Sequence, residues 1–135
     1  MDEMIMRTTF KIALMVLSLI PLCFAVTGLI GGASALNGET AVSAGLDNQF
    51  RYLSGYYLSL FFGIWYVLGD IDNRGTILRL LVIAIFIGGL ARVYSYFHVG
   101  PPPMNAMVGM FLEVTSPILI LWHRILQRSI GPVVP

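Results

Sequence analysis

Long apolar runs alternate with short polar segments along the chain. The apolar runs occupy residues 12–35, 50–68, 76–97 and 104–126. A transmembrane helix needs about 20 predominantly apolar residues to cross roughly 30 Å of hydrocarbon, and each run is close to or above that length. The pattern therefore predicts an all-α protein, a polytopic membrane four-helix bundle that forms one domain over residues 1–135.

The polar breaks carry residues that end helices. Residues 69–75 have the composition of a tight turn, so the second and third spans are predicted to be antiparallel neighbours. Residues 100–103, a glycine and three prolines, end the third span because proline supplies no N–H to a continuing helix. Pro21 and Pro117 are predicted to kink the first and fourth spans for the same reason.

The first run has an alternative interpretation as a secretory signal. Arg7 and Lys11 precede it, and the small residues 33–35 resemble a cleavage site. The apolar region of a signal is usually only ~7–15 residues long. The length of the run therefore favours a membrane span.

Composition supports a membrane environment and excludes several classes of function. Of the residues, 57% are hydrophobic and 11% charged, with a mean hydropathy of +0.83, whereas a soluble domain has about a quarter charged residues. A formal net charge of +1 without a Lys/Arg run argues against a nucleic acid partner. Cys23 is the only cysteine, which excludes an intramolecular disulfide and a multi-cysteine metal site. We expect no metal and no cofactor.

Basic residues are distributed unequally between the two ends of the predicted spans. Arg51 and Arg92 fall at the ends of the spans that face away from the two termini. The other six fall with the termini and the middle loop: Arg7, Lys11, Arg74, Arg79, Arg124 and Arg128. The positive-inside rule then predicts that both termini of this multi-pass protein are cytoplasmic. The tail, residues 127–135, is predicted to lie outside the membrane.

Ionisable residues share helix stripes with small residues, which is where membrane helices touch. Glu113 lies about 15 Å below the proline break at ~1.5 Å per residue, close to the midplane. A lone charge there costs at least about 2.5–3.5 kcal/mol, so we predict an Arg92–Glu113 pair with Arg51 above it. The stripes are Arg51, Gly55, Ser59 and Gly63 in span two, Ala84, Gly88 and Arg92 in span three, and Asn105, Gly109, Glu113 and Pro117 in span four.

Two guanidiniums against one carboxylate leave one positive charge uncompensated. We therefore expect a non-catalytic membrane protein in which Arg51, Tyr56, Arg92 and Glu113 bind an anionic lipid headgroup or a small amphiphile near the outer leaflet. Membrane lipids are then its main partners. The alternative for the cluster is that it only fixes helix register.

Other functions remain open. Small size, short loops and many small residues fit an accessory or assembly subunit of a larger membrane protein complex, or a homo-oligomer. An enzyme would use Glu113 as general acid or base on a lipophilic substrate, but no second catalytic group is evident. A small dimeric transporter is a further alternative. His98 and His123 fall at opposite membrane faces, and each is predicted to be an interfacial side chain rather than a metal ligand.

Short motifs in spans two to four resemble those of a known family. They are Phe50-Arg51-Tyr52 with Gly55 and Gly63, then residues 88–92 ending in Arg92, the turn at 100–102, and Glu113. This pattern is similar to that of a bacterial family of small four-helix inner-membrane proteins catalogued as a domain of unknown function. The resemblance implies the fold, the topology and a location in the bacterial inner (cytoplasmic) membrane, as a multi-pass protein, and it carries no known activity.

Overall fold

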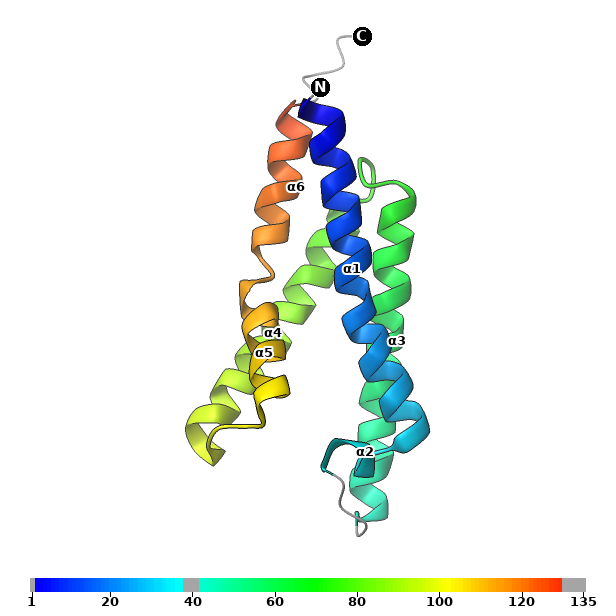
Figure 1. Cartoon of the computed structure of the whole chain (residues 1–135), viewed down its shortest axis with the longest axis vertical. Helices are drawn as coiled ribbons and strands as arrows, with labels where there is room; N and C mark the ends of the chain where they lie inside the picture. Colours follow the sequence, from blue (N-terminus) through cyan, green and yellow to red (C-terminus); the bar gives the residue numbers. More distant parts are fainter. Residues whose placement is uncertain (1, 38–41, 130–135) are drawn as a thin grey trace. The chain divides into compact units, whose positions relative to one another are not determined.

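The computed structural model describes residues 2–37 and 42–129 (Figure 1). All elements in these residues are helical, which confirms the all-α prediction for them. Residues 38–41 of the polar segment and 130–135 of the predicted tail lie outside the described residues. The helices are α1 (Asp2–Gly31), α2 (Ser34–Asn37), α3 (Ala44–Gly69), α4 (Gly75–Val99), α5 (Met104–Thr115) and α6 (Ile118–Ser129).

Three helical stretches in the described part of the chain are long and apolar enough to cross a membrane. They are residues 3–31, 75–99 and 104–128, the last of which joins α5 and α6. The 26-residue helix α3 is long enough, but it is not among the stretches that meet both conditions. The chain therefore has the helices of a membrane protein, with three candidate spans.

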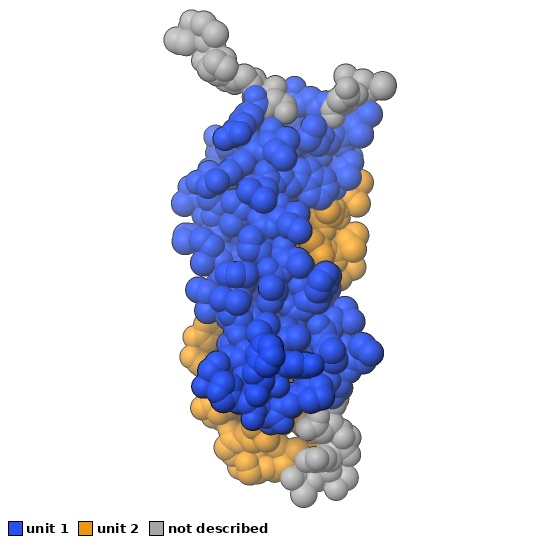
Figure 2. Space-filling model, turned by 90° about the vertical axis from the view of Figure 1, so that its left-hand side faces the viewer, with its two compact units in different colours: residues 1–10, 71–135 blue, residues 11–70 orange. Residues whose placement is uncertain are grey.

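Contacts divide the chain into two compact units (Figure 2). The hairpin unit comprises residues 11–70, and the terminal unit comprises residues 1–10 and 71–135. The single domain predicted from the sequence stays a prediction.

In the hairpin unit, α1 packs along α3 in the antiparallel sense. Trp65 Nε1 donates to Ser18 Oγ at 3.1 Å, and the rings of Phe24 and Tyr57 stack with centroids 5.7 Å apart. The buried positions of α1 recur every three or four residues, which is the spacing of a coiled-coil seam. They are Leu14, Ser18, Pro21, Ala25 and Gly28, followed by Gly32 just beyond the helix.

α1 and α3 approach each other closely at Gly28. A Cβ there would overlap the Ser54 hydroxyl and lie 2.9 Å from Ser54 Cβ. Ser54 tolerates burial because its hydroxyl donates to Phe50 O at 2.8 Å. A Cβ on Gly55, in contrast, would meet no described atom within 4 Å. The predicted stripe is therefore wrong at Gly55, and the contact runs one residue earlier, through Ser54.

The ends of α1 and α3 differ from the predicted spans. α1 starts ten residues before the apolar run and ends at Gly31, because Gly32 takes φ +63°, a left-handed conformation that terminates helices. It continues through Pro21. α3 begins at Ala44, where the Ser43 side chain accepts from the Leu46 N–H at 3.2 Å. The polar residues before Phe50, predicted to be a connection, thus form the first turns of a helix.

In the terminal unit, α4 and α5 cross closely at Gly89. A Cβ on Gly89 would lie 2.8 Å from Glu113 Cβ and 3.0 Å from Val114 N, whereas one on Gly88 would meet no described atom within 4 Å. The predicted stripe of span three is again off by one residue. Pro117 interrupts the fourth predicted span and separates α5 from α6, as its missing N–H predicts.

A polar cluster in the terminal unit joins the start of α1, the turn after α3 and α6. Arg7 forms an ion pair with Asp72. His123 is 2% exposed, and its Nε2 lies 2.7 Å from Ile71 O. Because a carbonyl only accepts, Nε2 carries the hydrogen. A Cβ on Gly75 would lie 2.6 Å from His123 Cε1, so glycine makes room for the ring. His123 is therefore a buried side chain of the terminal unit, and its position at a membrane interface stays a prediction.

Candidate functional site

The four predicted site residues fall into both units. Arg51 and Tyr56 lie on α3 in the hairpin unit, and Arg92 and Glu113 lie on α4 and α5 in the terminal unit. A single pocket made of all four stays a prediction. Within each unit, an arginine pairs with a carboxylate.

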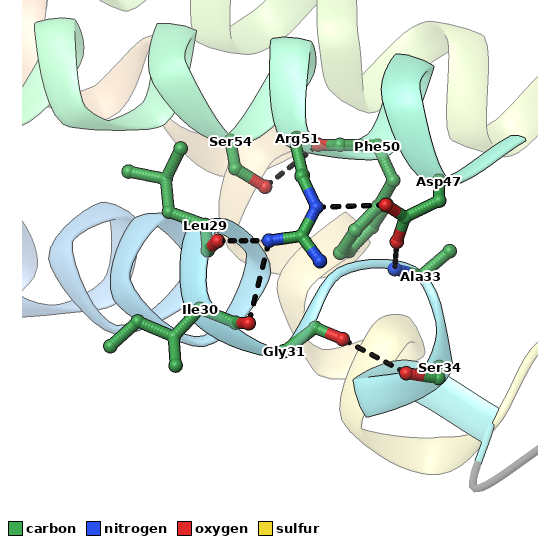
Figure 3. Close-up of polar contacts among 9 residues, drawn as sticks. All are labelled: Leu29, Ile30, Gly31, Ala33, Ser34, Asp47, Phe50, Arg51 and Ser54. Atoms are coloured by element: carbon green, nitrogen blue, oxygen red, sulfur yellow. Dashed lines mark hydrogen bonds and ion pairs between the residues drawn. The ribbon is translucent and has the colours of Figure 1, made fainter. Parts of the chain in front are cut away.

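Arg51 caps the C-terminal end of α1 (Figure 3). Its Nε donates to Asp47 Oδ2 at 2.8 Å, one turn earlier on α3. Its Nη1 donates to Leu29 O and, at 3.4 Å, to Ile30 O. The last carbonyls of a helix have no donor within the helix. The guanidinium therefore satisfies carbonyls that α1 leaves open.

Asp47 completes this cap from its second oxygen. Oδ1 accepts from the Ala33 N–H at 3.0 Å, just after the left-handed Gly32. The hydrogen bond from Arg51, and then the one from Ala33, lower the pKa of Asp47 below its usual range. The sequence predicted one uncompensated arginine charge because no carboxylate partner was assigned to Arg51. That premise is wrong, because Arg51 pairs with Asp47. The four-residue spacing of Asp47 and Arg51 would have predicted this ion pair on a helix. It was overlooked because the residues before Phe50 were predicted to be non-helical.

Tyr56 pairs with a second tyrosine that the sequence analysis did not single out. Its hydroxyl lies 2.8 Å from the Tyr52 hydroxyl, and the two ring centroids are 5.0 Å apart. The pair is one helical turn apart on α3, and both side chains are exposed. Spacing of i, i+4 on a helix was the signal that could have found Tyr52.

The predicted Arg92–Glu113 ion pair is present between α4 and α5. Arg92 Nε lies 3.0 Å from Glu113 Oε2, and the side chains are 30% and 17% exposed. Within the described part of the chain, the buried Oε2 accepts no well-aligned hydrogen bond. The guanidinium packs beside Gly109, where a Cβ would lie at an ordinary van der Waals distance of 3.7 Å from Arg92 Nη1. The pair thus sits between helices and leaves acceptor capacity on Glu113.

A partly open pocket of about 90 Å³ adjoins Arg92 in the terminal unit. Arg92, Ser95 and Tyr96 lie at i, i+3 and i+4, so they share one face of α4 and form one wall. Gly100, at φ +116°, ends α4 and lets the chain turn back into α5. The lining residues are Arg92, Ser95, Tyr96, Gly100, Pro102 and Ala106.

Ser95 and Tyr96 were missed because they are unremarkable alone. They lie three and four residues after Arg92 and shortly before a Gly/Pro turn. That spacing could have placed them on the same helix face as Arg92. His98 lies on the same helix, where it stacks on Tyr94 with ring centroids 3.9 Å apart. In residues 2–37 and 42–129, no group of three His, Cys, Asp or Glu side chains could hold a metal ion.

Comparison with known proteins places the chain in a family without giving it an activity. No curated protein and no solved structure matches it. The family described as a domain of unknown function, DUF4345, matches residues 9–123, a range that includes both ion pairs and the pocket. Because this match covers most of the sequence, the chain belongs to the DUF4345 family.

Proposed function

We propose that this protein is a four-span membrane protein that binds the anionic headgroup of a lipid at Arg92. The observation that carries the proposal is the pocket beside the Arg92 guanidinium, between helices apolar enough to cross a membrane. Arginine stays charged in almost any environment and binds carboxylates and phosphates through paired N–H groups. Because Glu113 already supplies Arg92 with a counter-anion, the headgroup would bind through hydrogen bonds from the guanidinium rather than to an uncompensated charge.

Each arginine is assigned a different role in this proposal. The contacts of Arg51 to Asp47, Leu29 and Ile30 close the end of α1. Arg92 instead lines a pocket, with Glu113 holding the guanidinium from the neighbouring helix. Glu113 is thus a positioning residue, and Arg92 is the residue that contacts the headgroup.

The proposal includes α3 as the fourth span. Its charged residues, Asp47 and Arg51, lie in its first two turns, and residues 52–69 carry no charge. At ~1.5 Å per residue, this uncharged stretch is about 27 Å long, close to the hydrocarbon thickness. Four crossings put both termini on one side, which the basic residues assign to the cytoplasm of a bacterial cell.

Cysteine labelling tests the crossing of α3. In a Cys23→Ser background, Asn37→Cys and Asn73→Cys place one thiol before and one after α3. With an impermeant reagent on intact cells, we expect labelling before α3 and none after it. Labelling of both positions, or of neither, would mean that α3 does not cross, and labelling of Asn73→Cys alone would invert the topology.

Lipid retention tests the headgroup site. The protein is purified in mild detergent from membranes containing anionic lipid, and bound lipid is measured by native mass spectrometry. Arg92→Gln should lose most bound anionic lipid, whereas the matched control Arg124→Gln, on the exposed side of α6, should retain it. Equal retention in the two variants contradicts the proposal. Co-purification of a stoichiometric protein in place of lipid would favour the accessory-subunit alternative.

A further inference from the structure

We infer that the pocket at the α4–α5 turn selects a phosphoryl group over a carboxylate. The inference rests on the proposed headgroup site and specifies its ligand chemistry. It depends on residues that the sequence analysis did not assign, namely Ser95 and Tyr96 on the wall that carries Arg92.

The side chains of α4 that line the pocket carry two kinds of donor. Arg92 supplies a planar fork of N–H groups, and Ser95 and Tyr96 add hydroxyls one turn further along α4. A carboxylate has two coplanar oxygens, which the fork alone can satisfy. A phosphoryl group has additional oxygens out of that plane, which the two hydroxyls can reach.

The opposite wall begins α5 and favours the same chemistry. Ala106, in the first turn of α5, lines the pocket, and the preceding Pro103 makes no side-chain cap. The first N–H groups of a helix point outward and attract anions, phosphate in particular. The Ala106 N–H already donates to Pro103 O and to Asn105 Oδ1, each at 2.9 Å, so it is the two N–H groups before it, of Met104 and Asn105, that would add to the side-chain donors of α4.

The size of the pocket limits what enters it. A partly open pocket of about 90 Å³ with Gly100, Pro102 and Ala106 on its far side accommodates a small tetrahedral anion rather than a bulky headgroup. The acyl chains of a lipid would then remain outside. The same chemistry could also be supplied by free inorganic phosphate, so the experiment includes both sources.

The test compares two anionic amphiphiles on the full-length protein in detergent. Binding of phosphatidic acid, of oleate and of inorganic phosphate is measured by titration, for the wild type and for Ser95→Ala and Tyr96→Phe. Matched controls are Ser59→Ala and Tyr94→Phe, which lie outside the pocket. We expect phosphatidic acid to bind at least about 10-fold tighter than oleate, and each hydroxyl deletion to weaken its binding about 5- to 10-fold. Oleate binding and melting temperature should be unchanged.

The outcomes separate this inference from the proposed function. If oleate binds as tightly as phosphatidic acid, or the hydroxyl deletions affect both equally, phosphoryl selectivity is wrong while an Arg92 headgroup site stands. If Arg92→Gln, which removes the charge and the fork of N–H groups, leaves phosphatidic acid and oleate binding unchanged, the headgroup site fails as well. If inorganic phosphate displaces phosphatidic acid, the site is assigned to the free ion. If it does not, the site is assigned to the lipid. Both results support phosphoryl recognition.

Discussion

The two arginine–carboxylate pairs occupy very different local settings. Asp47 and Arg51 lie one turn apart on a single helix, and their remaining contacts go to backbone groups at the end of α1. Arg92 and Glu113 come from two helices that cross at a glycine, and a pocket adjoins them. The first pair is bonded to backbone groups although Arg51 stays 43% exposed, and the second, with side chains 30% and 17% exposed, lies beside a pocket.

This difference shows that an arginine at the end of an apolar helix has no fixed role. At Arg51, a neighbouring helix ends within reach, and its carbonyls use the donors. At Arg92, the segment that follows α4 turns at Gly100 and the prolines, and a pocket lies beside the guanidinium. In the proposed function, the adjacent segment decides whether the arginine serves as a cap or as a binding residue.

The largest stability effect is expected at the inter-helix pair. Arg92→Leu leaves Glu113 without its cation, and removal of one partner of a buried pair costs about 3–5 kcal/mol. The double variant Arg92→Leu/Glu113→Leu should recover much of this loss, because apolar residues often replace a buried pair at little cost. Thermal unfolding in detergent measures both. A double variant as unstable as the single one would show that the pair is not coupled.

The second-largest loss of stability is expected at Gly32, in the turn that Asp47 and Arg51 contact. At Gly32, an alanine would adopt an unfavourable left-handed φ, and its Cβ would overlap Asp47 Oδ1 and lie 2.7 Å from Arg51 Nη2. Gly32→Ala should therefore destabilise by about 1–3 kcal/mol, as overpacking and positive φ together imply. Gly55→Ala is the control, since its Cβ meets no described atom within 4 Å. Equal melting temperatures for the two variants would contradict the close contact.

A smaller effect is expected from the cap itself. Arg51→Gln removes the ion pair to Asp47 and the donors to Leu29 O, but the side chain is 43% exposed, and exposed pairs contribute little. The melting temperature should fall by a few degrees, with bound lipid unchanged. A loss of lipid without a change in melting temperature would assign Arg51 to the headgroup site.

The smallest effect is a pH dependence of stability at Asp47. Its pKa in the folded protein is lowered by Arg51 and Ala33, from an unfolded value of about 3.9. The contribution of this carboxylate is therefore complete above that value and is lost as the pH falls through the lower folded pKa. Melting curves of the wild type and Asp47→Asn, recorded from pH 6 downward, should converge at acidic pH. A constant difference would exclude this linkage.

The sequence predicted the helices and one ion pair well, and the contact faces less well. Hydropathy and prolines located the turns, and the cost of a charge at depth led from Glu113 to Arg92. The helical start of α3 was missed because its residues are polar, and Asp47 was lost with it. Ser54 and Gly89 were distinguished from Gly55 and Gly88 only by the structure, since spacing alone does not decide which of two adjacent small residues touches a neighbouring helix.

The most direct test compares the same conservative change at both arginines. Arg51→Lys and Arg92→Lys keep the charge but remove the planar fork of donors. We expect Arg92→Lys to lose bound phospholipid in native mass spectra with a nearly unchanged melting temperature. Arg51→Lys should retain phospholipid and melt at a lower temperature. If Arg51→Lys loses as much phospholipid as Arg92→Lys, both arginines belong to one site, and the division of roles is wrong.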